Sequence, residues 1–138
     1  MVIGGQAVLL YGEPRLTRDI DITLGVNIEK LTDLLKALKK IGLIPLPENI
    51  YDFVNKTFVL PVKDDKTDIR VDFVFSQTSY EKKAIDRANM HKIDDIEIAF
   101  ASLEDMIIHK IFSGRPRDME DVRSILVKNP DYDKDYII

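Results

Sequence analysis

The feature that most constrains the fold lies near the start of the chain, where a Gly-Gly pair precedes an alternating segment with two aspartates. In this segment, Leu16–Leu24, one face carries Leu16, Arg18, Ile20, Ile22 and Leu24, and the other carries Thr17, Asp19, Asp21 and Thr23. Alternate side chains of a strand share a face, so Asp19 and Asp21 lie together with Cα atoms about 6 to 7 Å apart. Two carboxylates this close repel each other. The pattern therefore predicts a strand whose charge is offset by solvent, by arginines or by a divalent cation.

The residues before this strand predict a strand-to-helix turn. Val2-Ile3 is interpreted as the end of a strand, Gly4-Gly5 as the turn, and Gln6 to Tyr11 as a short helix that ends at Gly12. Glycines at such a turn let backbone N–H groups approach a phosphate, and the helix dipole favours its negative charge. A strand with about two residues is shorter than the usual five or six, so we expect upstream structure or an edge supplied from elsewhere. The chain contains neither a P-loop motif nor a G-x-G-x-x-G dinucleotide motif.

The remaining segments predict a mixed α/β (α+β) domain. The expected elements are a helix Ile28 to Ile41 capped by Asn27, a strand within Tyr51 to Val62, a turn Lys63 to Thr67, a strand Asp68 to Phe75, a helix Ser79 to Asn89, a strand Ile96 to Phe100, a helix from Ser102 to near Gly114, and a helix from Pro116 to about Lys128. The two strands around the polar turn suggest a hairpin. We expect one domain over residues 1–138, with a small antiparallel or mixed sheet in residues 1–101 and C-terminal helices in residues 102–138.

A third carboxylate extends the acidic face. On the strand Asp68 to Phe75, Asp72 shares the polar face with Asp68 and Arg70, so it joins Asp19 and Asp21 if the two strands are neighbours. Hard oxygen ligands of this kind suit Mg²⁺, with Mn²⁺ as the alternative, and the remaining sites of such a metal take water and phosphate oxygens. The competing interpretation is a solvated strand face with an exposed hairpin carboxylate at Asp72.

Other charged residues have two open interpretations each. Arg15 and Arg18 either reach phosphates or neutralise the aspartates, and alternation places Arg15 or Thr17 nearer the site than Arg18. Lys110 either binds phosphate, pairs with a buried acid or snorkels along an apolar stripe. Asp118 and Asp121 are expected mainly to cap and charge the first turn of the last helix. His91 and His109 are interpreted as surface or satisfied histidines, and the acidic tail with Tyr132, Asp133 and Tyr136 as a solvated end.

Composition excludes several classes of protein. A net charge of -4 argues against a broad footprint on duplex nucleic acid, and the absence of cysteine excludes disulfides and thiolate metal sites. No apolar run approaches the roughly 20 residues of a membrane span, so no membrane association is expected. We expect a cytoplasmic protein.

The run I-G-G-Q-A-x-x-x-Y-G-x-x-R-x-T-R-D-I-D-I resembles the nucleotidyltransferase superfamily that includes DNA polymerase beta. Within it, the chain looks like the small stand-alone members related to toxin-antitoxin and abortive-infection nucleotidyltransferases. The matching positions are Gly4, Gly5, Asp19, Asp21 and Asp72. Near the C-terminus, Lys110 followed by Arg115, Asp118 and Asp121 is similar to the helical segment of these families.

The resemblance implies a nucleotidyltransferase fold that binds a nucleoside triphosphate with Mg²⁺ and transfers a nucleotidyl group to the hydroxyl of an acceptor, which is a tRNA, a protein or a small molecule. Asp19, Asp21 and Asp72 would be the catalytic and metal-binding carboxylates. The phosphate-binding residues would be Gly4, Gly5, Gln6, Arg15, Thr17, Arg18 and Lys110. Two alternatives stay open: a nucleotide-binding pseudoenzyme without turnover, and a toxin-like component whose antitoxin-type partner masks the site.

Overall fold

The computed structural model describes residues 1–12 and 19–138. Its strands are β1 (Val2–Ile3), β2 (Asp19–Thr23), β3 (Leu43–Pro45), β4 (Val59–Asp64), β5 (Arg70–Val74), β6 (Asn89–Ile93) and β7 (Ile96–Phe100). Its helices are α1 (Gly4–Tyr11), α2 (Leu31–Ile41), α3 (Ile50–Thr57), α4 (Ser79–Asp86), α5 (Leu103–Ser113), α6 (Pro116–Lys128) and α7 (Lys134–Ile137), with one 3₁₀ turn, Ile28–Lys30, before α2. The expected mixed α/β fold is confirmed.

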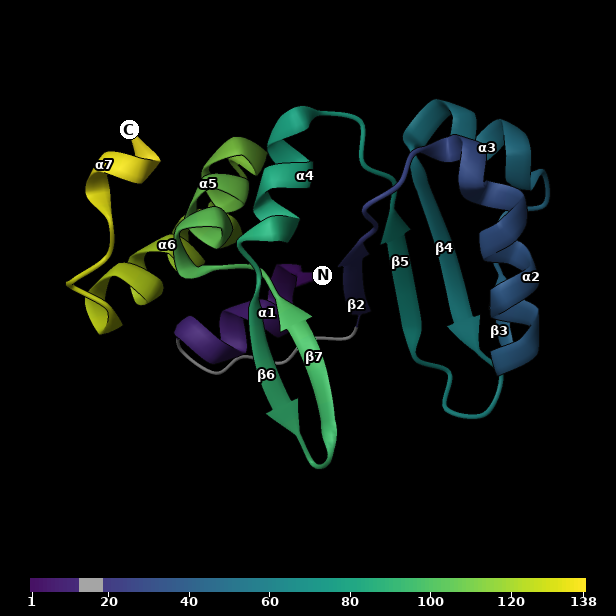
Figure 1. Cartoon of the computed structure of the whole chain (residues 1–138), viewed down its shortest axis with the longest axis horizontal. Coiled ribbons are helices and arrows are strands. Elements are labelled where there is room, and N and C mark those ends of the chain that lie inside the picture. Colours follow the sequence, from purple (N-terminus) through teal and green to yellow (C-terminus); the bar gives the residue numbers. More distant parts are fainter. Residues whose placement is uncertain (13–18) are drawn as a thin grey trace.

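The described strands form a single mixed sheet in the order β3-β4-β5-β2-β1-β7-β6 (Figure 1). The pairs β2–β5 and β1–β7 are parallel, and the other neighbours are antiparallel. The short strand β1 lies between β2 and β7, and Val2 is paired on both sides, whereas Ile3 pairs with Asp21 of β2. The pairing of β1 with β2 continues at Met1, whose amine donates a hydrogen bond to the Thr23 carbonyl at 3.0 Å.

Two hydrophobic clusters flank the acidic strand β2. One packs α2 and α3 against β4 and β5 around Leu60, Val62 and Phe73, and the other packs α1, α5 and α6 together around Val8, Met106 and Ile125. Ile22 on β2 contacts both clusters. Because burying these apolar side chains is the main favourable term in folding, the two clusters hold β2 and α5 in fixed positions relative to β1. In Figure 1 the helices α5 to α7 lie on the side of the molecule away from α2 and α3.

The largest correction concerns the segment around Tyr51. We expected a strand within Tyr51 to Val62, but residues 50–57 form helix α3, and only the second part forms strand β4. The side chain of Asn49 accepts a hydrogen bond from the Asp52 backbone N–H at 3.1 Å, which caps the new helix. The aromatic and β-branched residues suggested a strand, but an Asn cap followed by an acid in the first turn was the stronger local signal. The hairpin itself is present as β4 and β5.

Smaller differences occur at the ends of elements. The helix expected over Ser79 to Asn89 ends at Asp86, and Asn89 begins β6, which pairs with β7. Strands β3 and β6 and helix α7 were not expected. The C-terminal tail is not a solvated end, because the Tyr136 hydroxyl donates to Asp105 at 2.9 Å. Among the described residues, no helix combines the length and the apolar character needed to cross a membrane.

Candidate functional site

The parallel pairing of β2 and β5 brings the acidic residues together. In this register Asp21 is directly opposite Asp72, and Asp19 is opposite Arg70. Paired residues of neighbouring strands are about 4.8 Å apart, and in a parallel pair they point to the same face of the sheet. The condition on which the shared acidic face depended, that the two strands are neighbours, is therefore met. All three carboxylates lie along one short stretch of adjacent strands.

The electrostatics of this face centre on Asp21. Burial raises the pKa of Asp21, and the negative charges of Asp72 and Asp19 raise it further, against the opposing effect of Lys110 and Arg115. The negative charge of Asp72 is partly compensated, because Arg70 Nε donates a hydrogen bond to its Oδ1 at 2.9 Å. Among the described residues, and without a cation, this face thus holds more negative charge than neighbouring cations neutralise.

The Gly-Gly pair places the start of helix α1 beside Asp21. The two glycines are the first two residues of the helix, rather than a turn before it, and the helix begins without a side-chain cap. Gly4 has a φ of +68°, a left-handed backbone conformation that residues with a side chain adopt only at a cost in free energy. A Cβ at Gly4 would overlap Asp21 Oδ2 and lie 3.0 Å from Asp21 Cγ. Gly4 is therefore required both by the backbone conformation and by the approach of the carboxylate.

Gly42 provides a matched control for Gly4, since its φ is +79° but a Cβ there would meet nothing within 4 Å. Left-handed backbone strain costs about 1–2 kcal/mol in both Gly4→Ala and Gly42→Ala. The overlap with Asp21 should add roughly 1–3 kcal/mol for Gly4→Ala only, as overpacking usually does. Urea unfolding of the two variants measures this difference. Equal losses in the two variants would show that the close approach of Gly4 to Asp21 is not a constraint.

A cavity of about 190 Å³ opens where Gly4 and Asp21 face helix α5. Its lining consists of Ile3, Gly4, Asp21, Met106, His109, Lys110, Ser113 and Arg115. A helix N-terminus, a carboxylate and two cationic side chains thus border one small space. We call it the polar cavity. Its chemistry suits a ligand with phosphate oxygens, because the first turn of α1 offers backbone donors and the cations offer charge.

The cation Lys110 is held by two buried carboxylates. Lys110 Nζ lies 2.9 Å from Asp118 Oδ1 and 3.0 Å from Asp121 Oδ2, and the Lys110 side chain is only 7% exposed. Arg115 Nε also donates to Asp118 Oδ2, at 2.6 Å. Burial would raise the pKa of Asp118, but the hydrogen bonds from Arg115 and Lys110 outweigh it and hold that pKa below its usual value. Of the three interpretations of Lys110, the structure shows the pairing with buried acids.

The expected capping role of Asp118 and Asp121 is wrong. Helix α6 has Arg115 at its N-cap position and no side-chain cap, although Asp118 does lie in its first turn. Both aspartates are buried, and their carboxylates pair with Lys110 on α5 instead of the backbone N–H groups of α6. These ion pairs join α5 to α6 on one side of the polar cavity.

The fit of a divalent cation follows from the donors and from the repulsion between them. Asp19, Asp21 and Asp72 are hard oxygen donors of the kind that Mg²⁺ prefers, and the pKa of Asp21 is raised by burial and then by the charges of Asp72 and Asp19, which a cation would offset. Within the described ranges, no three acidic or histidine side chains are gathered closely enough to hold a metal ion. The donor set suits a divalent cation in kind and in strand register, but the three carboxylates would have to come closer together to hold one, and Asp72 Oδ1 is already paired with Arg70.

Of the predicted phosphate-binding residues, Gly4 and Lys110 line the polar cavity. Arg15, Thr17 and Arg18 lie outside the described residues. Gly5 and Gln6 are in the first turn of α1. The roles of all these residues stay predictions. Two lining residues, His109 and Ser113, were missed as functional candidates; their one signal was the i, i+4 spacing on the same helix that carries Lys110.

Comparisons with known proteins identify the family and the fold. A family model described as "Nucleotidyltransferase of unknown function (DUF6036)" matches residues 1–134. Among solved structures, an antigenic nucleotidyltransferase-like protein from Paracoccidioides brasiliensis is similar, with a TM-score of 0.61 and 17% identity. The match covers 94% of this chain and 66% of that one, so this chain spans slightly less than two thirds of its length. At this identity the likeness shows the fold alone. A search of curated proteins finds no match.

Proposed function

The chain belongs to the nucleotidyltransferase family of unknown function DUF6036, and on this premise we propose that it binds a nucleoside triphosphate with Mg²⁺ and transfers the nucleotidyl group to an acceptor hydroxyl. The observation that carries the proposal is the pairing of Asp21 with Asp72 beside the first turn of α1. Asp21 lies opposite Asp72 in the strand register, contacts the left-handed Gly4 and lines the polar cavity. A carboxylate placed beside a helix N-terminus in this way is the kind of site that phosphoryl chemistry needs.

The charges of the polar cavity support a requirement for metal. Lys110 and Arg115 are already paired with Asp118 and Asp121. Little of their positive charge is left for a triphosphate, while Asp19, Asp21 and Asp72 add negative charge nearby. A triphosphate would be repelled by this face unless a divalent cation accompanied it. Bound Mg²⁺ would neutralise the carboxylates and the phosphate oxygens and would polarise the reacting phosphorus.

The chain's own residues would then perform three tasks. The backbone N–H groups of the first turn of α1 would bind phosphate oxygens beside the ion-paired Lys110 and Arg115 of the cavity wall. Asp19 and Asp21 would hold the cation. Asp72 completes this set and accepts the proton of the acceptor hydroxyl as its oxygen attacks the α-phosphorus. The bond between the α-phosphorus and the bridging oxygen breaks in line, and pyrophosphate leaves.

The proposal is tested by incubating the protein with each of the four nucleoside triphosphates, labelled at the α-phosphate, with Mg²⁺ and with tRNA, protein or small-molecule acceptors. We expect label on one class of acceptor, release of pyrophosphate, and loss of both when EDTA removes the metal. Measurable nucleotide binding without transfer to any acceptor would contradict the enzymatic proposal and support a nucleotide-binding pseudoenzyme. Labelled product that still forms in EDTA would contradict the role of the metal.

A further inference from the structure

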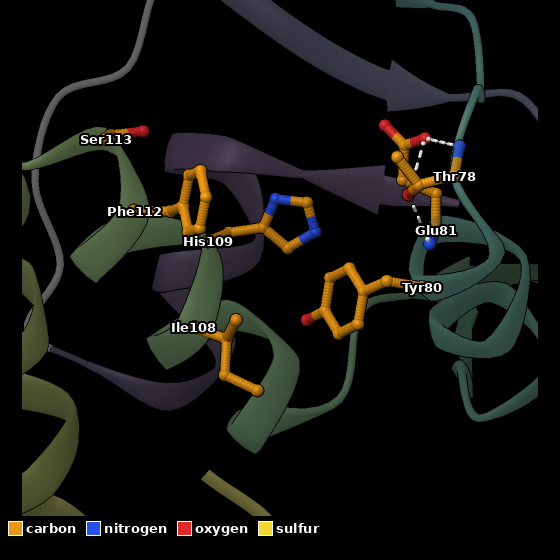
Figure 2. Close-up of a pocket in the computed structure, with 7 residues that line it drawn as sticks. All are labelled: Thr78, Tyr80, Glu81, Ile108, His109, Phe112 and Ser113. Carbon is orange, nitrogen blue, oxygen red and sulfur yellow. Dashed lines mark hydrogen bonds between the residues drawn. The ribbon is translucent and has the colours of Figure 1, made fainter. Parts of the chain in front are cut away.

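A second and larger pocket adjoins the polar cavity. It has a volume of about 540 Å³, lies between α4 and α5, and is lined by Thr78, Tyr80, Glu81, Ile108, His109, Phe112 and Ser113 (Figure 2). His109 and Ser113 also line the polar cavity, so the two spaces share a wall on α5. We call the larger space the aromatic pocket. Its volume falls within the usual range of small-molecule sites, roughly 300–1,000 Å³.

The walls of the aromatic pocket are mainly rings and apolar groups. The ring centroids of Tyr80 and His109 are 5.9 Å apart and the two ring planes are tilted by 47°. Phe112 lines the same space, and its residue is 92% exposed. A phenylalanine this exposed buries almost none of its ring in the protein core, so its ring is free to contact a ligand without disturbing the core. An aromatic ring that lines a pocket and stays open to solvent is suited to contact a ligand.

Two ionisable side chains of the lining, His109 and Glu81, offer little free charge to a ligand in the aromatic pocket. Burial lowers the pKa of His109, against the opposing charges of Asp105 and Glu81, which favours an uncharged imidazole. The Glu81 carboxylate accepts hydrogen bonds from the backbone N–H groups of Gln77 and Thr78, as part of the capping box of α4. The pocket therefore suits a flat, uncharged group, and the polar cavity beside it suits an anionic one.

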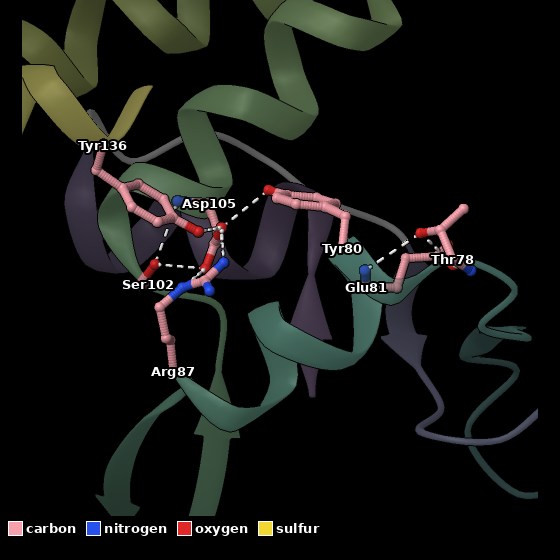
Figure 3. A network of polar contacts seen from close by, with 7 residues as sticks. All are labelled: Thr78, Tyr80, Glu81, Arg87, Ser102, Asp105 and Tyr136. Carbon is pink, nitrogen blue, oxygen red and sulfur yellow. Dashed lines mark hydrogen bonds and ion pairs between the residues drawn. The ribbon is translucent and has the colours of Figure 1, made fainter. Parts of the chain in front are cut away.

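The wall formed by Tyr80 is fixed from behind (Figure 3). The Tyr80 hydroxyl donates to Asp105 Oδ1 at 2.8 Å, and Asp105 is completely buried. The same carboxylate accepts hydrogen bonds from Tyr136 on α7, from Arg87 after α4, and from Ser102 before α5. A carboxylate with this many donors is held in one orientation, and it holds the Tyr80 ring in turn. The Tyr80 wall of the aromatic pocket is thus preformed.

We propose that the aromatic pocket holds the nucleobase of the nucleotide whose phosphates occupy the polar cavity, with Phe112 as a stacking surface. The inference rests on the proposed function and adds the binding site for the base. The two spaces are continuous because they share a wall formed by His109 and Ser113. The polar cavity suits the anionic phosphates of a nucleotide, and the aromatic pocket suits its uncharged base. The attacking acceptor then has to approach from the side of Asp72 on β5, away from α4.

The test compares ligands that share phosphates but differ in the base. Affinities for the four nucleoside triphosphates and for inorganic tripolyphosphate are measured calorimetrically with Mg²⁺, in the wild type and in Phe112→Ala. Because Phe112 is exposed, this variant is expected to fold. Val127→Ala is the matched control, because Val127 is 81% exposed on α6 and lines neither space. Phe112→Tyr keeps an aromatic ring and should retain affinity.

We expect Phe112→Ala to bind the preferred nucleoside triphosphate roughly five- to a hundredfold more weakly, the usual effect of losing a base–aromatic stack. Its affinity for tripolyphosphate should stay within about twofold of the wild-type value, because tripolyphosphate has no base that could stack on Phe112. The control Val127→Ala should change neither affinity.

Two results would overturn the base site while leaving the proposed function intact. One is an unchanged affinity for the preferred nucleoside triphosphate in Phe112→Ala. The other is an equal loss for the nucleotide and tripolyphosphate. If the wild type binds neither ligand, the proposed function fails and the base site fails with it. Asp21→Asn gives the complementary pattern, because loss of the cation should weaken both ligands together.

Discussion

Replacement of Lys110 by methionine is expected to lower the free energy of unfolding by about 3–5 kcal/mol, the usual cost of breaking a buried ion pair by removing one partner. Lys110 Nζ contacts both Asp118 and Asp121, and all three side chains are at most 7% exposed. Methionine matches the length of the aliphatic stem but supplies no charge. In the variant, Asp118 keeps the largely exposed Arg115, while Asp121 loses the ammonium group that it contacts in the wild type.

Urea unfolding at neutral pH measures this loss. Lys40→Met is the control, because Lys40 is exposed on α2, and its effect should stay within about 0.5 kcal/mol. The wild-type contacts lower the pKa of Asp118, so the stability they contribute is present at neutral pH and is lost as the pH falls below the ordinary aspartate value of 3.8. The difference between wild type and Lys110→Met should therefore narrow in acid. A loss below about 1 kcal/mol at neutral pH, the low end for a single interaction, would contradict the role of Lys110 as the link between α5 and α6.

The second large effect is expected in Asp21→Asn, where activity and stability should move in opposite directions. Transfer of the labelled nucleotidyl group should fall by at least about 100-fold, since even groups that only orient metal ligands cost 10- to 100-fold when lost. The free energy of unfolding, measured without metal, should rise. Asparagine has the shape of aspartate without the charge that burial, Asp72 and Asp19 make unfavourable.

The sign of this stability effect follows from the raised pKa of Asp21. The folded protein holds the Asp21 proton more tightly than the unfolded chain does, so ionised Asp21 destabilises the fold at any pH above its folded pKa. As the pH falls below the ordinary aspartate value, Asp21 is protonated in both states and the destabilisation disappears. The advantage of Asp21→Asn should therefore be largest near neutral pH and absent in acid.

Asp65→Asn controls for the change in net charge, because Asp65 is exposed in the turn between β4 and β5. It should alter neither transfer nor unfolding. Mg²⁺ should stabilise the wild type and have no such effect on Asp21→Asn, because only the wild type keeps the ligand. A stable Asp21→Asn variant with full transfer activity would contradict the assignment of Asp21, and a less stable one would contradict the electrostatic strain on β2.

Much of the fold could be predicted because the chain carries strong local signals. Strand β7 was predicted with its observed bounds, and helix α6 was predicted with Pro116 at or just before its first turn, where the structure places Pro116 as the first residue. The alternation of Asp19 and Asp21 predicted their shared face. Helix α3 could not be predicted from the same kind of reasoning, since its aromatic residues favour a strand until the Asn49 cap is weighed. The short strands β3 and β6 are stabilised by pairing with distant segments and carry weak signals of their own.

The site shows the same division between local and distant information. The sequence alone determined which carboxylates share a face, that glycines begin the first helix, and that a third carboxylate lies on a strand of matching polarity, because these follow from backbone periodicity. Only the tertiary structure decided that Asp21 is opposite Asp72, that Lys110 is held by Asp118 and Asp121, and that His109 and Phe112 border a pocket beside the polar cavity. Those relations depend on strand order and helix packing, which are set by long-range burial of apolar surface and not by any local pattern.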